Sequence, residues 1–308
     1  MGQRRSIARG TEIVVSGSTS NLGPGFDALS VAVTVYLTVR VVDVLPGQPH
    51  VLDMHFAGGG APSGENRIAT GFRAALARFG DPVPGLRVEV TSDIPMRAGL
   101  GSSAAATVAG MRLYEAATSP RAIGDLMEIA SGIEGHPDNA AAALLGGITL
   151  SCQHDDGRIS TQAWRWPDEL RFVIATPEAE LETAFARKVL PPQISLHDAV
   201  FNLQRALLLV RALETGAYED LHEALRDRWH QPARQQFVPG LADALALDHP
   251  AVLGAYLSGA GPSIAVLASD RHLEAAALLS EIYARLRVPC TVRTLSAHQP
   301  EVPVRTAS

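Results

Sequence analysis

The chain has 308 residues, with 32 acidic and 26 basic side chains and a formal net charge of -6 at pH 7. This balance argues against a nucleic-acid or anionic-membrane partner, because either would need a basic face. The length predicts two domains of ordinary size, and 46% hydrophobic residues provide material for their cores.

Two cysteines, Cys152 and Cys290, are too few for a disulfide framework and form no CxxC pair for a metal. We therefore expect reduced thiols and a cytoplasmic location. No stretch approaches the roughly 20 apolar residues of a membrane span, so we expect no membrane partner.

In the N-terminal half, the segments Glu12 to Ser16 and Val31 to Leu45 are β-branched and alternate in polarity, which predicts strands. Residues 17–27 between them are rich in glycine, serine and proline and predict a loop. The further predicted elements of this half are a helix over Asn66 to Phe79, a strand over Leu86 to Ser92, an alanine-rich helix ending near Thr118, a helix over Ala122 to Ser131, a short helix to Leu145 capped by Asp138 or Asn139, and a strand over Ile148 to Cys152.

A hairpin turn is predicted at His154 to Gly157, and we place the domain boundary there, with domains over 1–155 and 156–308. Strands and helices then alternate, which favours an α+β fold with helices laid on one face of an antiparallel sheet. The predicted strands are Arg171 to Ala175, Ala255 to Ser258, Ile264 to Leu267 and Cys290 to Leu295, and the helices are Leu196 to Glu214, Tyr218 to Arg226 and His272 to Leu286.

The segment from Ala98 to Ser103 has the composition of a phosphate-binding loop. Its glycines let the backbone approach an oxyanion, and the helix that follows offers unpaired N–H groups at its positive end. A Walker A loop is excluded, because Ala104 follows the serines and Lys188 lies far away in the sequence. A dinucleotide fingerprint fits residues 99–104 but is disfavoured, because no regular βαβ alternation surrounds it.

Three motifs occur in order along the chain. The central one, P-x-x-x-G-L-G-S-S-A-A, stands unbroken from Pro95 to Ala105, the first runs from Ser20 to Asp27, and the last from Leu257 to Ser263. Together they resemble the motifs of the GHMP kinases, the superfamily of galactokinase, homoserine kinase and mevalonate kinase. The wording of residues 21–27, and of the loop from Glu134 to Asn139, resembles the homoserine kinases most, although Ser20 stands where their motif has alanine.

The resemblance implies a two-domain fold, with an N-terminal domain similar to ribosomal protein S5 domain 2 and a ferredoxin-like C-terminal domain. A cleft between them would hold ATP with Mg²⁺ and L-homoserine, whose hydroxyl would be phosphorylated to O-phospho-L-homoserine in threonine biosynthesis. It also implies a homodimer.

The resemblance and the loop chemistry together assign nucleotide-site residues. The resemblance points to Ser103 and Glu128 as Mg²⁺ ligands, with Ser102 as the alternative to Ser103, and these side chains offer the hard oxygen donors that Mg²⁺ needs. The residues predicted to bind ATP are Asn66, Pro95, Arg97, Ala98, Gly99, Leu100, Gly101, Ser102, Ser103, Ala104, Gly259 and Gly261.

Homoserine is a zwitterion with a terminal hydroxyl, so its site needs an acid, cations and a hydroxyl partner. The predicted substrate-binding residues are Asn21, Asp27, His136, Asn139, Thr183, Arg187 and Arg234, with Asn139, Asp138 and Arg234 as catalytic residues. Asp27 would take the ammonium, and the planar fork of Arg suits the carboxylate. Asp138 is the obvious carboxylate for a general base, but we favour a reaction that only positions the hydroxyl.

Two other functions stay open. One is a related kinase with threonine, mevalonate or a sugar as acceptor, although Asp27 favours an amino acid over mevalonate, which has no ammonium. The other is a non-catalytic relative that senses nucleotide and metabolite, against which intact Ser103, Glu128 and Asn139 argue.

Overall fold

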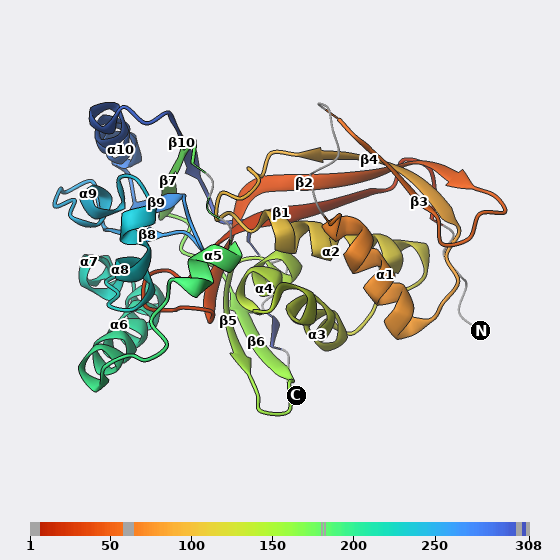
Figure 1. Cartoon of the computed structure of the whole chain (residues 1–308), viewed down its shortest axis with the longest axis horizontal. Coiled ribbons are helices and arrows are strands. Elements are labelled where there is room, and N and C mark those ends of the chain that lie inside the picture. The colour runs from red at the N-terminus through yellow and green to blue at the C-terminus, as the bar shows by residue number, and fades with distance from the viewer. Residues whose placement is uncertain (1–6, 58–64, 180, 182, 300–303, 306–308) are drawn as a thin grey trace.

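The computed structural model describes residues 7–57, 65–179, 181, 183–299 and 304–305. Its strands form two sheets, one of seven strands and one of four, which lie end to end along the molecule (Figure 1). None of the helices in these ranges is long and apolar enough to cross a membrane.

The seven-stranded sheet is organised around one long strand, β2, which pairs with three others. Its strands are β1 (Glu12–Ser20), β2 (Leu29–Leu45), β3 (Leu52–Phe56), β4 (Gly85–Ser92), β5 (Ile148–Gln153), β6 (Ile159–Trp164) and β11 (Val304–Arg305). The order is β11-β6-β5-β2-β4-β3, with β1 also on β2. The pairing of β3 with β4 is parallel, so this sheet is mixed.

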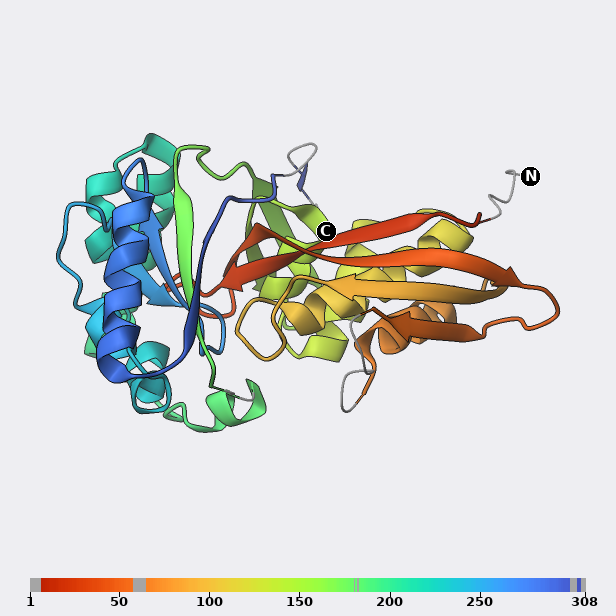
Figure 2. The same cartoon turned by 90° about the horizontal axis from the view of Figure 1, so that it is seen from above.

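Four helices cover one face of this sheet, and the other face stays open in the view from above (Figures 1 and 2). They are α1 (Arg67–Phe79), α2 (Ser102–Ala117), α3 (Ile123–Glu134) and α4 (Asp138–Leu145). The buried side of β2 and the apolar stripes of these helices form the core of this unit.

The four-stranded sheet has the strand order β10-β7-β9-β8, and all its pairs are antiparallel. Its elements are β7 (Arg171–Pro177), α5 (Thr183–Lys188), α6 (Leu196–Thr215), α7 (Leu221–Ala224), α8 (His230–Arg234), α9 (Leu241–Leu245), β8 (Gly254–Leu257), β9 (Ile264–Ala268), α10 (His272–Leu286) and β10 (Cys290–Leu295), with 3₁₀ turns at Tyr218–Asp220 and Gln235–Phe237. Helices α5 to α9 connect β7 to β8, and α10 connects β9 to β10. This is the ferredoxin-like arrangement that was predicted.

The change from one sheet to the other lies later in the chain than the predicted boundary at residue 155. The expected turn at His154 to Gly157 exists, but it joins β5 to β6 within one sheet. The change therefore falls between Trp164 and Arg171, and β11 returns to the first sheet. The cores are continuous across the junction, since Phe172 and Tyr256 of the second sheet belong to the same cluster of buried side chains as Leu29 of the first.

Helices α1 and α2 cross at two glycines, which bring the backbones into close approach. A Cβ atom on Gly71 would lie 2.1 Å from the Thr107 carbonyl oxygen, and one on Gly110 would lie 2.0 Å from that of Ile68. Because these neighbours are backbone atoms, neither can move aside cheaply.

We therefore expect Gly110→Ala to destabilise the protein by about 1–3 kcal/mol through overpacking, although alanine is the better helix former. Gly132→Ala is the matched control, because Gly132 is exposed in α3 and a Cβ there meets nothing within 4 Å. It should stabilise by roughly 0.5–1 kcal/mol. Urea unfolding measures both changes. If the two substitutions change the free energy of unfolding in the same direction, the close packing at Gly110 is contradicted.

Candidate functional site

The glycine loop before α2 is fixed by hydrogen bonds to its carbonyl groups. The carbonyl of Ala98 accepts from the backbone N–H of Ser263 (3.2 Å), that of Leu100 from the N–H of Ser18 (3.1 Å), and that of Gly99 from the Ser258 hydroxyl (2.7 Å). The loop is thus held between β1 and the turn after β8.

Left-handed glycines allow this fit. Gly99 has φ 74° and Gly101 φ 69°, and a Cβ on Gly99 would lie 2.3 Å from the Ser258 carbonyl oxygen. Gly101 is the N-cap of α2, and no side chain in the described part of the chain caps this end. The first N–H groups of α2 therefore stay available to an anion.

A cavity of about 590 Å³ lies beside this loop, at the junction of the two units. Loops from both units contribute to it, together with residues of α2, α4, α5 and α8. Helices α2, α4 and α5 lie near the middle of Figure 1. It is lined by Ser20, Asn21, Phe26, Asp27, Arg67, Met96, Arg97, Ala98, Gly99, Gly101, Ser102, Ser103, Ala104, Glu134, His136, Asp138, Asn139, Ala184, Arg187, Arg234, Gly259 and Ala260. Residues from all three sequence motifs thus line one space.

Four residues predicted to bind ATP lie outside this lining: Asn66, Pro95, Leu100 and Gly261. Asn66 instead caps α1, since its side-chain oxygen accepts from the N–H of Ala69 (3.1 Å). Leu100 is buried in the core. Arg67, the next residue along from Asn66, reaches the cavity instead.

The acid beside the phosphate loop is Glu134, which the sequence analysis gave no role. Its carboxylate accepts hydrogen bonds from the hydroxyls of Ser103 (3.1 Å) and Thr107 (2.7 Å). The predicted Mg²⁺ ligand Glu128 is exposed and lies outside the cavity lining. Both belong to α3, and six residues make about one and two-thirds helical turns, so they lie on different faces. The oxygens of Ser103 and Glu134 fit Mg²⁺.

The polar loop before α4 forms a network around Asn139. The Asn139 side-chain oxygen accepts from the Ser18 hydroxyl (2.8 Å), and its amide nitrogen donates to the hydroxyl of Ser20 (3.1 Å) and the carboxylate of Asp138 (3.3 Å). The orientation of this amide is therefore set from three sides.

Asp138 is buried and pairs with His136, at 2.5 Å between Oδ1 and Nδ1. Asp138 was predicted as an N-cap, but α4 begins at Asp138 itself and Pro137 precedes it. Burial opposes protonation of His136, but the hydrogen bond and charge of Asp138 outweigh it and raise the pKa of His136. Burial likewise opposes ionisation of Asp138, but His136 and the backbone N–H of Asn139 together lower its pKa.

The same cavity also carries the charges predicted to hold an amino acid. Arg187 donates to Asp27 through two parallel bonds of 2.7 and 3.0 Å. Asn21 supports the acid, because its side-chain oxygen accepts from the N–H of Asp27 (3.1 Å) while its nitrogen donates to the Gly259 carbonyl (2.8 Å). The ammonium of a zwitterion could replace Arg187 as the partner of Asp27, and its carboxylate could replace Asp27 as the partner of Arg187.

Arg234 is buried beside this pair. Burial and the nearby charge of Arg187 lower the pKa of Arg234 to about 10, which still leaves it protonated at neutral pH. Of Thr183, also predicted to bind substrate, only the backbone at the start of α5 is described. Phe26, given no role in the sequence analysis, lies with its ring 5.6 Å from the Arg187 guanidinium carbon and 5.3 Å from that of Arg234.

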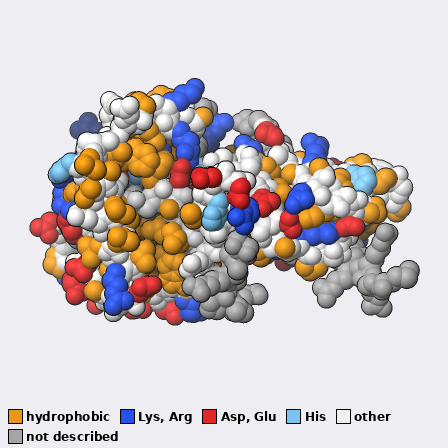
Figure 3. All heavy atoms as spheres, turned by 90° about the horizontal axis from the view of Figure 1, so that it is seen from below, with side chains coloured by type: hydrophobic (Ala, Val, Ile, Leu, Met, Phe, Trp, Pro, Cys, Tyr) orange, Lys and Arg blue, Asp and Glu red, His pale blue; other side chains and the backbone are white. Residues whose placement is uncertain are grey.

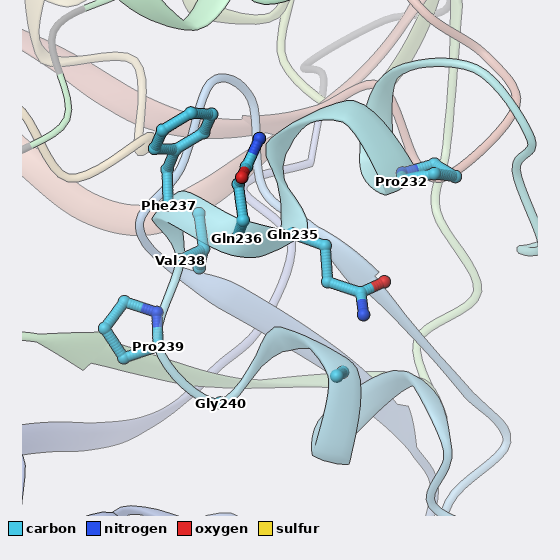
Figure 4. A pocket seen from close by; sticks show the side chains of 8 residues that line it. Pro232, Gln235, Gln236, Phe237, Val238, Pro239 and Gly240 are labelled. Carbon is cyan, nitrogen blue, oxygen red and sulfur yellow. The ribbon is translucent and has the colours of Figure 1, made fainter.

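A second hollow, of about 460 Å³, lies beside the turn that joins α8 to α9 (Figure 4). It is lined by Pro232, Gln235, Gln236, Phe237, Val238, Pro239, Gly240 and Ala242. Among these described residues none is titratable, so this hollow offers no charge to a phosphate or a zwitterion.

Comparison with known proteins agrees with the motifs. Residues 66–147 match the GHMP kinases N terminal domain and residues 209–285 match the GHMP kinases C terminal domain. The chain belongs to the GHMP kinase family. The resemblance stated from the three motifs is thereby confirmed.

Its relatives within this family include homoserine kinases. The chain is 34% identical to "Homoserine kinase" of Moorella thermoacetica over 92% of this chain and 95% of that protein, and 37% identical to "Homoserine kinase" of Nostoc sp. over 94% and 97%. A crystal structure of homoserine kinase from Cytophaga hutchinsonii superposes with a TM-score of 0.82 at 26% identity, covering 98% of each chain.

The different positions of Glu134 and Glu128 yield a test. If the Glu134 carboxylate and Ser103 hydroxyl hold Mg²⁺, Glu134→Gln should raise the half-saturating Mg²⁺ concentration for ADP formation roughly 10-fold or more. Glu128→Gln, on the same helix but exposed, should leave it unchanged. A larger effect of Glu128→Gln would restore the original assignment.

Proposed function

We propose that this chain is a homoserine kinase, which transfers the γ-phosphoryl group of ATP to the hydroxyl of L-homoserine and yields O-phospho-L-homoserine for threonine synthesis. One observation carries the proposal: a single cavity joins the free N-terminus of α2 to an acid and two guanidinium groups. The first end suits a polyphosphate and the second a zwitterion. The homoserine kinases among the relatives support the same substrate.

At the phosphate end, the N–H groups that open α2 and the glycine loop would hold the β- and γ-phosphates. Bound Mg²⁺, held by Ser103 and Glu134, would neutralise phosphate charge. Because Ser18, Ser258 and Ser263 already occupy the loop carbonyls, these groups do not turn their negative ends toward the anion. The loop is therefore preorganised for phosphate.

At the acceptor, the new bond joins the homoserine oxygen to the γ-phosphorus as the bond from that phosphorus to the β,γ-bridging oxygen breaks. Asn139 would orient the hydroxyl, since its amide is fixed beside Ser18 and Ser20. The lowered pKa of Asp138, opposed by burial but set by His136, makes this carboxylate a weak base. The hydroxyl proton then passes to an oxygen of the transferred phosphoryl group.

At the amino-acid end, Asp27 would take the ammonium, while Arg187 and Arg234 would take the carboxylate. Mevalonate has no ammonium and would leave Asp27 without a partner, which disfavours it. The sensor alternative is also less favoured, because Ser103 and Asn139 both line the cavity with their polar groups in place.

An ADP-release assay with L-homoserine, L-threonine, mevalonate and galactose tests the function. We expect the highest kcat/KM with homoserine. Preference for another acceptor would make the chain a different GHMP kinase, and release of no ADP with any of them would favour the sensor.

The role of Asp138 has a separate test. If the hydroxyl is only positioned, Asp138→Asn should retain most of kcat, because asparagine keeps the shape and can still bond His136. A true general base would cost roughly 10²–10⁴-fold in kcat. Thermal melting of the variant confirms that it is folded, and a loss of that size in a folded variant would make Asp138 the base.

We also propose that the chain forms a homodimer, as the family resemblance implies. Hydrophobic side chains gather on the C-terminal half in the view from below (Figure 3), and α6 exposes a stripe formed by Leu196, Val200, Leu203 and Leu207. Their spacing of four and three residues is that of a helix-pairing seam, and two copies of α6 could cover each other.

Light scattering should therefore give twice the chain mass. Leu203→Glu should give the mass of one chain, whereas Leu273→Glu, which is also exposed but lies on α10, should not. A single-chain mass for the unaltered protein would contradict the dimer.

A further inference from the structure

His230, the first residue of α8, connects two parts of the site without lining the cavity. Its side chain is fully buried. One ring nitrogen, Nε2, lies 2.8 Å from the Gly23 carbonyl oxygen, and the other, Nδ1, lies 3.2 Å from Nη1 of Arg234. A carbonyl can only accept and a guanidinium can only donate. The ring is therefore neutral, with its proton on Nε2.

The remaining contacts of Arg234 are to backbone carbonyls. Its Nε donates to Ala186 (3.0 Å) and its Nη1 also to Gly259 (3.2 Å). Among the described residues, His230 supplies the one side-chain acceptor, and Nη2 has no hydrogen-bond partner. Because Arg234 lines the cavity, Nη2 is the donor left for a ligand.

The other end of His230 holds the loop that carries the acid. Gly23 belongs to the same turn as Asn21 and Asp27, and it has φ 69°. A Cβ there would lie 2.0 Å from the Leu225 carbonyl oxygen, so this turn is also pressed against the second unit. His230 therefore bridges the acid-bearing turn and the buried guanidinium.

Charged groups surround the ring from three elements. Asp227, before α8, has an oxygen 3.8 Å from Nε2, and Arg234 lies on α8 itself. The charge of Asp27 acts on the ring from the first unit. Phe26 carries no charge, and its ring centroid lies 5.1 Å from that of His230. Burial and the charge of Arg234 lower the pKa of His230, against the opposing effect of Asp227. This agrees with the neutral tautomer that the hydrogen bonds require.

We propose that His230 is a positioning residue: as a neutral acceptor it orients Arg234 toward the substrate carboxylate and fixes the distance from that carboxylate to the ammonium site at Asp27. This rests on the proposed binding role of Arg234. A proton on Nδ1 would face the guanidinium, so protonation would break the bridge. The bridge thus favours α-amino acids, in which the two charged groups are one carbon apart.

Two substitutions separate the two ends of the bridge. In His230→Asn the side-chain oxygen can take the place of Nδ1 and keep the acceptor for Arg234. In His230→Gln the amide nitrogen can take the place of Nε2 and keep only the donor to Gly23. We expect the KM for homoserine to rise roughly 10-fold or more in the glutamine variant and clearly less in the asparagine variant.

The KM for ATP should change in neither variant. Equal rises of the homoserine KM in the two variants, or a parallel rise in the KM for ATP, would overturn the positioning role. Thermal melting of both variants separates this result from loss of the fold.

A second readout does not depend on turnover. Nitrogen-15 NMR of the histidine rings should show His230 as the Nε2–H tautomer in the unaltered enzyme. In Arg234→Met the pKa of His230 should rise, because the repelling guanidinium is gone while Asp227 and Asp27 remain. The ring signals of exposed His222, on α7, provide the internal reference in both proteins.

An unchanged titration of His230 would refute the bridge even if homoserine kinase activity is found. Conversely, absence of turnover with homoserine would refute the proposed function, and the titration would still decide whether His230 and Arg234 are coupled.

Discussion

The phosphate loop of this protein is held in shape by the second structural unit. Ser258 and Ser263 bind the carbonyls of Gly99 and Ala98, and a buried chain of hydroxyls supports them: Tyr256 bonds Thr19, which bonds Ser258. Because Thr19 lies in β1, this chain ties both sheets to the loop. The anion site therefore forms only when the two units are packed together, which their continuous core ensures.

The same junction explains why the charged residues tolerate partial burial. Asp27 and Arg187 neutralise each other through a two-bond pair, and Asp138 pairs with His136. Burying either charge alone would cost several kcal/mol. A zwitterionic ligand can replace this pair without leaving an unpaired charge, because it supplies one charge of each sign, whereas a singly charged acceptor that separated Arg187 from Asp27 would leave one of them unpaired. Substrate preference thus follows from charge balance within the site.

Much of this arrangement could be predicted from the sequence, because the motifs are local and the elements have clear periodicity. The bounds of α10 and β10 were predicted as observed, and so was the fold class. Other details depend on directions that only packing decides. Glu128 matched the family spacing, yet the face of α3 that meets Ser103 carries Glu134. The side chain of Asn66 caps α1. The hairpin at residues 154–157 joins two strands of one sheet and does not mark the change between the sheets. The bridge through His230 joins residues about 200 positions apart, which no local pattern reveals.

The central claim is that one junctional cavity holds both the phosphates and the amino acid. A crystal structure of the protein with Mg²⁺, a non-hydrolysable ATP analogue and L-homoserine tests it most directly. We expect the γ-phosphate against the N–H groups of Ser102 and Ser103, the homoserine hydroxyl beside Asn139, and its carboxylate on Arg187 and Arg234. Homoserine bound away from these residues, for example in the hollow beside Phe237, would contradict the account.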